Sequence, residues 1–142
     1  MKKSEIVLAA LATSHGASFS PVQIQKFLFL LDRNLADHLG GPFFEFVPYD
    51  YGPFDKSIYD VLDSLVAKDL VETATPPGSR YQIYYTTPAG HKIGVGLLRK
   101  MPTAASNFIK EVSIFVRKLS FSQLIRAIYR DYPDMKINSV FN

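Results

Sequence analysis

The stretch VPYDYGPFDKSIYDVLDSLVAKDLV, residues 47–71, decides how this chain folds. Tyr51, Gly52 and Pro53 form a sharp structural turn, because glycine permits the bend and proline fixes φ at about −65°, which suits a first helical turn. A helix and then a short β-type segment at 70–71 follow, so the stretch predicts the second half of a helix-turn-helix that enters a wing. The apolar stripe of that helix recurs at helical spacing and consists of Ile58, Val61, Leu62, Leu65 and Val66.

Composition indicates one compact domain over residues 1–142, since 47% of the residues are hydrophobic and the net charge is only +3. The absence of cysteine excludes disulfides, thiolate metal sites and a cysteine nucleophile. The first residues, MKKSEIVLAALA, are weakly similar to a signal peptide. Glu5 interrupts their apolar run, which is also short, so we reject that interpretation. The absence of cysteine also fits a cytoplasmic location, which we expect. No apolar run reaches the roughly 18 residues of a membrane helix, so we expect no membrane partner.

Capping and turn residues predict the remaining elements around this stretch. The expected fold is mainly α with a small β-hairpin, a winged helix-turn-helix core and a C-terminal helical extension over about residues 103–142. The expected helices are 4–14 capped by Ser4, 21–39 capped by Ser20 with Gln23, one after Thr87, 103–118, and one from Ser120 to Pro133. The expected strands are a brief one at 44–47 and two longer ones at 70–73 and 80–86, which are joined at Pro77-Gly78.

Nothing in the sequence assembles a catalytic site. The three histidines, His15, His38 and His91, have no metal-ligand spacing, and no phosphate-binding loop or nucleophile elbow occurs. Asp60 and Asp63 are an i,i+3 pair, for which a solvated helix face is the commoner explanation. The sequence therefore predicts a non-enzymatic protein with no catalytic, metal-binding or cofactor-binding residues and no cofactor.

Charge is distributed unequally along the chain. Residues 1–75 contain 6 Lys/Arg and 10 Asp/Glu, whereas residues 76–142 contain 10 Lys/Arg and 3 Asp/Glu. DNA phosphates would repel the acidic helix at 55–69, so the first hypothesis is a protein partner, and the alternative is a DNA-binding regulator that uses the basic second half. Opposite charges on two faces also allow copies of the chain to associate. The candidate residues for binding a partner or nucleic acid are Arg80, Lys92, Arg99, Lys100, Arg117, Lys118, Arg126 and Arg130, with Tyr129, Tyr132 and Phe141 as aromatic anchors.

Three segments together resemble the Panacea domain, the family of the SocA antitoxin and many phage-associated proteins. They are IQKFLFLLD (24–32), YDYGPF (49–54) and IYDVLDSLVAKDLVE (58–72), in which Phe27 to Phe29 occupy the LLY positions of the family pattern and Gly52-Pro53 match its turn. The closing IYRDYPDMKINSVF (128–141) is similar to the end of YwgA-like proteins. The resemblance implies a helical fold of winged-helix character and a role as antitoxin, adaptor or regulator, with a toxin or a protease component as partner. It brings no catalytic residues.

Overall fold

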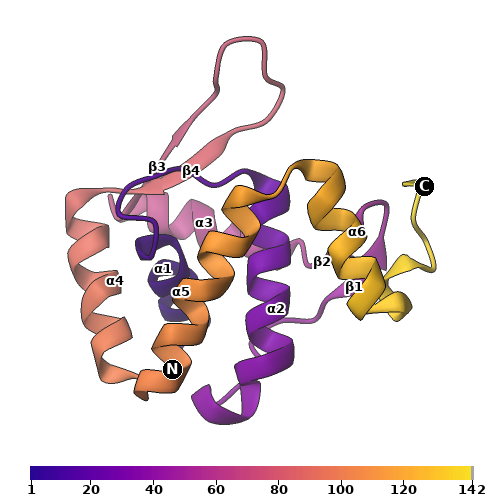
Figure 1. The fold of residues 1–142 in the computed structure, drawn as a ribbon. Coiled ribbons are helices and arrows are strands. Elements are labelled where there is room, and N and C mark those ends of the chain that lie inside the picture. Colours follow the sequence, from indigo (N-terminus) through magenta and orange to yellow (C-terminus); the bar gives the residue numbers. More distant parts are fainter. Residues whose placement is uncertain (142) are drawn as a thin grey trace.

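Helices dominate the computed structural model, which describes residues 1–141 (Figure 1). Within these residues there are six α-helices and two separate two-stranded antiparallel hairpins, so the expectation of a mainly α chain with a small β-hairpin is confirmed. The elements are α1 (Lys3–Ala12), α2 (Pro21–Leu39), β1 (Val47–Tyr49), β2 (Gly52–Phe54), α3 (Ser57–Ala67), β3 (Val71–Ala74), β4 (Ile83–Thr86), α4 (Pro88–Lys100), α5 (Thr103–Lys118), α6 (Phe121–Asp131) and the short 3-10 helix η1 (Pro133–Lys136).

Capping hydrogen bonds mark the starts of α2 and α6 at the residues that the sequence predicts. At the start of α2 the Gln23 N–H donates to Ser20 Oγ at 3.2 Å, and the Ser20 N–H donates to Gln23 Oε1 at 2.8 Å. Ser120 and Gln123 repeat this reciprocal pair at the start of α6, with distances of 2.9 and 3.2 Å. These pairs satisfy backbone donors that a helix start otherwise leaves free. The first helix differs from the prediction, because it begins at Lys3 and Ser4 lies inside it.

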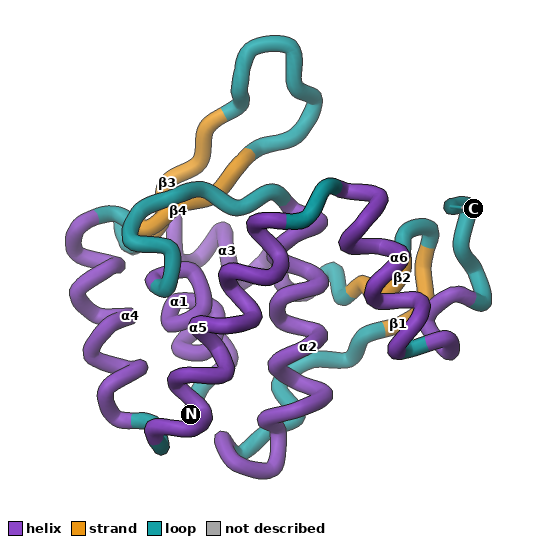
Figure 2. Tube along the Cα trace, in the orientation of Figure 1, coloured by secondary structure: helices purple, strands orange, loops and turns teal. Residues whose placement is uncertain are grey.

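Strands β3 and β4 lie against the helices, and the long loop that joins them extends away from the rest of the molecule (Figure 2). Within that loop Gly78 has φ +77°, and the Ser79 N–H donates to the Pro76 carbonyl at 3.0 Å, as a type II turn requires. Phe19, between α1 and α2, pairs with Tyr84 of β4 through two backbone hydrogen bonds of 2.8 and 2.9 Å. The hairpin is thereby tied to the start of α2.

The predicted turn at Tyr51, Gly52 and Pro53 is a β-hairpin and not a helix start. Tyr49 pairs with Gly52, and Pro53 lies within β2. The helix begins only at Ser57, where Asp55 Oδ1 accepts the Ser57 N–H at 2.8 Å. The apolar stripe predicted for the helix is present, with Ile58, Leu62 and Leu65 buried on α3. Pro53, however, belongs to strand β2, where it pairs with Pro48 of β1.

The core surrounds α1, whose residues from Ile6 to Ala12 are all buried. Helix α4 approaches two parts of the chain closely: a Cβ on Gly94 would collide with the Ala12 side chain of α1, and one on Gly90 would collide with the Leu70 carbonyl, just before β3. Helix α5 packs along α2, and α5 and α6 both contribute to the same buried cluster. The predicted C-terminal extension is therefore part of the core. No helix in the described part of the chain has the length and apolar character needed to cross a bilayer.

Candidate functional site

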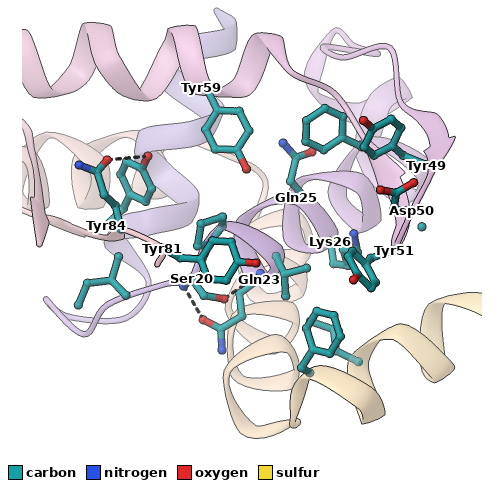
Figure 3. A pocket seen from close by; sticks show the side chains of 18 of the residues that line it. Ser20, Gln23, Gln25, Lys26, Tyr49, Asp50, Tyr51, Tyr59, Tyr81 and Tyr84 are labelled. Atoms are coloured by element: carbon teal, nitrogen blue, oxygen red, sulfur yellow. Dashed lines mark hydrogen bonds between the residues drawn. The ribbon is translucent and has the colours of Figure 1, made fainter. Parts of the chain in front are cut away.

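A cavity of about 770 Å³ lies where α2, the two hairpins and the start of α6 meet (Figure 3). We call it the Lys26 cavity. One wall is the first part of α2, a second is the β1–β2 hairpin, and a third is the chain that leads into β4. Its volume is within the range of roughly 300–1,000 Å³ that holds small ligands or a short piece of chain. The lining residues are 20–23, 25–26, 49–52, 54, 59, 79–84, 119, 121 and 124.

Lys26 contributes a buried cation to this cavity. The residue is only 3% exposed, and its Nζ donates a hydrogen bond to the Pro53 carbonyl at 3.2 Å. Among residues 1–141 no carboxylate lies within 4.0 Å of the ammonium group. Burial lowers the pKa of Lys26 from 10.5 to about 8, so the side chain still carries its charge at neutral pH.

Gln25 fixes the connection between β2 and α3. Its Nε2 donates to the Asp55 carbonyl at 3.0 Å, and its Oε1 accepts the Asp55 N–H at 2.9 Å. The Asp55 carboxylate in turn accepts the N–H groups of Glu45 and Ser57, both at 2.8 Å. Burial alone would raise the pKa of Asp55, but these hydrogen bonds outweigh it and hold that pKa below its ordinary value. Gln25 and Lys26, both buried, thus form the floor of the cavity, and their hydrogen bonds hold the chain at Pro53 and Asp55 against α2.

Four exposed aromatic side chains surround the opening of the cavity. Tyr49 is 53% exposed, Tyr51 42%, Tyr81 67% and Phe121 45%. Tyr51 packs edge-on against Phe121 with ring centroids 5.2 Å apart, which joins the β1–β2 hairpin to α6. Tyr59 of α3 also lines the cavity, and burial raises the pKa of its hydroxyl. We call Tyr49, Tyr51, Tyr81 and Phe121 the aromatic rim.

The turn residues predicted from sequence belong to this site. Tyr51 is on the rim, Gly52 lines the cavity and Pro53 accepts the Lys26 hydrogen bond. Gly52 has φ +99°, and a Cβ there would stand 3.3 Å from Tyr129 Cε1 and 3.7 Å from Lys26 Cε. Glycine is required at this position, because the backbone conformation disfavours side chains and the space is already filled.

The predicted basic residues do not converge on one surface. Arg80 lines the Lys26 cavity, but α4 and α6 lie on opposite sides of the molecule with α5 and α2 between them (Figure 1). Arg126 lies over the Phe141 ring at 5.5 Å, and Arg130 pairs with Asp131 at 3.2 Å. The remaining predicted residues divide between α4, with Lys92, Arg99 and Lys100, and the end of α5, with Arg117 and Lys118.

The three aromatic residues predicted as partner anchors are occupied within the fold. Tyr129 is buried, and its hydroxyl donates to Ser139 Oγ at 2.6 Å. The Tyr132 ring packs on Phe29 at 4.9 Å, and the Phe141 ring packs on Phe121 at 6.1 Å. Sequence reasoning missed Lys26, Tyr81 and Phe121, although a lysine within the otherwise apolar run of α2 is a signal that could have indicated a buried charge.

The remaining candidate chemistry is sparse. The rings of His15 and His91 lie 5.5 Å apart, and His38 lies separately near the end of α2. Over residues 1–141 no group of three or more His, Asp or Glu side chains is placed to hold a metal ion.

Comparison with known proteins identifies no relative: no protein-family model matches the chain, and no curated protein gives a significant sequence match.

Proposed function

We propose that this chain is a non-enzymatic protein-binding module, an antitoxin-like or phage-associated regulator, and that the Lys26 cavity holds a segment of its partner. The observation that carries the proposal is the aromatic rim: four exposed aromatic side chains surround one cavity of about 770 Å³. Tyrosine and other aromatic residues are enriched in protein interfaces, where each buries a large area. Clustered exposed apolar groups of this kind mark interaction sites.

The order of elements supports a winged-helix assignment within this proposal. The Phe19–Tyr84 bridge adds a short third strand beside β4, so the order is helix, bridge strand, α2, α3, β3 and β4. The β1–β2 hairpin is then an insertion between the second and third helices. Asp60 and Asp63 are exposed on α3, and their charge disfavours the usual docking of a third helix against DNA phosphates. A protein partner fits this surface better.

The resemblance to the Panacea family points the same way. Its three sequence segments supply, respectively, Gln25 with Lys26, the Gly52-Pro53 turn, and the helix that Asp55 precedes. Hydrogen bonds of Gln25 and Lys26, at the floor of the cavity, hold the chain at Asp55 and Pro53, and the Asp55 carboxylate accepts the Ser57 N–H at the start of α3. The family's implied partners, a toxin or a protease component, are the partner classes that we propose for this chain.

Site-specific photo-crosslinking tests the proposal. A photoreactive phenylalanine analogue replaces Tyr81 on the rim in one variant, and in the matched control it replaces Ile114, which is exposed on α5 away from the cavity. In the native host we expect an adduct with one protein from the rim position and none from the control. The partner is then identified by mass spectrometry and purified. Replacing Tyr49 and Tyr81 together with serine should weaken its binding about tenfold or more, as loss of interface anchors does.

Two results would overturn this proposal: an adduct formed only from position 114, or full affinity in the Tyr49→Ser/Tyr81→Ser variant. DNA binding through the basic second half is the alternative outcome. It predicts a mobility shift that weakens steeply with salt, with a log–log slope of about −0.9 per neutralised phosphate.

A further inference from the structure

We propose that Lys26 is the anion-recognition residue of the cavity, and that the bound partner segment carries a glutamate or aspartate side chain whose carboxylate reaches the Lys26 ammonium group. This inference rests on the docking function proposed above. It adds the chemistry of the partner: an extended segment with one acidic residue between apolar neighbours.

The ammonium group of Lys26 has hydrogen-bond donors that the described residues do not use. Lys26 lies at the floor, 3% exposed, with its Nζ 3.9 Å from the point where a Cβ on Gly52 would stand. Figure 3 shows its amine nitrogen among the side chains of the cavity, beside Tyr51. A lysine ammonium has three N–H donors, and in the described residues only the Pro53 carbonyl accepts one of them. Two donors remain for a ligand.

No carboxylate in residues 1–141 forms an ion pair with Lys26. The Asp55 carboxylate is committed to the backbone N–H groups of Glu45 and Ser57. Asp50 also lines the cavity, but it is exposed to water and lies beyond 4.0 Å from the ammonium. Arg80 adds a second cation to the lining. A carboxylate of the bound segment would therefore form the ion pair that Lys26 lacks within the described residues.

The buried charge of Lys26 lowers the stability of the fold. A buried charge without an ionic partner destabilises the fold, whereas a hydrophobic residue of similar volume would not. Lys26 lies in a run where Ile24, Phe27 and Leu28 are all buried and apolar. Because Lys26 lines the cavity, recognition of an anion there explains why a charged side chain occupies this position.

The aromatic rim beside Lys26 favours an acidic side chain of a protein segment as the anion. The rim side chains are aromatic and exposed, so they bind the apolar neighbours of the acidic residue at the surface. The ammonium lies below them at the floor. A partner segment can cross the opening with its backbone between the rim residues, while one acidic side chain extends to the Lys26 ammonium group at the floor.

Peptide selection tests the inference. Random hexapeptides are displayed between fixed flanking sequences, so that no free carboxyl terminus is present, and are selected on the parent protein and on Lys26→Met. We expect peptides from the parent to be enriched in Glu or Asp at one position beside aromatic or aliphatic residues. Peptides from Lys26→Met should keep the apolar preference and lose the acidic one. A second library with free carboxyl termini is selected in parallel.

Each outcome has a distinct meaning. No binder from either library, with a rim variant that holds its cellular partner as tightly as the parent, overturns the docking function itself. Binders without acidic enrichment, or with equal enrichment on Lys26→Met, overturn the role of Lys26 and leave the docking function intact. Acidic selectivity confined to free carboxyl termini overturns the assignment to a side chain.

A measurement on the unmodified protein makes the test independent of how Lys26→Met folds. One selected peptide, blocked at both ends, is compared with its Glu→Gln form by isothermal titration. We expect the glutamine peptide to bind about tenfold or more weakly, because a charge-assisted hydrogen bond is lost. On Lys26→Met the two peptides should bind equally. Equal binding of both peptides to the parent would refute the ion pair.

Discussion

Replacing Lys26 with methionine should change the stability of this protein in a way that depends on pH. Burial lowers the Lys26 pKa from 10.5 to about 8, so the unfolded chain binds more protons than the folded one between these values. The stability of the parent therefore rises with pH across this window. At pH 7 the folded cation carries the full cost of its burial, about 3 kcal/mol for a pKa difference of this size. Methionine removes that cost.

The substitution also leaves the Pro53 carbonyl without its donor, which costs about 1–3 kcal/mol at every pH. The test is therefore how the difference in unfolding free energy between the variant and the parent changes with pH. Integrating the linkage between the two pKa values, we expect the variant to lose about 2 kcal/mol relative to the parent between about pH 7 and about pH 9.5.

Urea unfolding of both proteins at these two pH values measures the effect. Burial raises the pKa of Tyr59 and Tyr84, but both proteins share these groups, so their contribution cancels in the difference. A variant-to-parent difference that stays constant with pH, or that moves in favour of the variant at high pH, would refute the reasoning that Lys26 is a buried and uncompensated cation.

Three further substitutions test other parts of the structure. Gly52→Val should cost about 1–3 kcal/mol, because Gly52 has φ +99° and a Cβ would stand 3.3 Å from Tyr129; an unchanged thermal melt would contradict the hairpin geometry. Gly96→Ala is the matched control, since a Cβ there meets nothing within 4 Å, and it should raise stability by about 0.5–1 kcal/mol in the same melt. Reversing Arg126 and Arg130 to glutamate should leave the circular dichroism spectrum intact and slow association with the partner; equal affinity at two salt concentrations would remove this face from the binding surface.

The sequence alone determined the features that depend on a few neighbouring residues. The starts of α2 and α6 follow from Ser20 with Gln23 and from Ser120 with Gln123, because each capping pair is only three residues apart. The Gly78 turn is equally local. Helix existence could be predicted because apolar periodicity and capping act within one or two turns.

The hairpin at residues 47–54 could not be predicted in the same way. Its strands have three residues each, so their local signal is weak, and the remote end of the chain holds them. The Asn138 side chain donates to the Pro48 carbonyl at 3.1 Å, and the Val140 N–H donates to the Asp50 carbonyl at 2.9 Å. From the neighbouring residues alone, Pro53 fits a first helical turn as well as a strand.

The candidate site was decided by tertiary structure. Sequence marked the turn at Gly52, but the cavity also needs Lys26 from α2, Tyr81 from the loop before β4 and Phe121 from α6, which are remote in the chain. The same side-chain types elsewhere have other roles: Tyr129 is buried in the core, although its aromatic side chain near the basic residues of the last helix made it a candidate anchor. Local sequence fixes which face of a helix is apolar. Only the packing of all the helices determines which apolar and charged groups are covered and which remain open to a ligand.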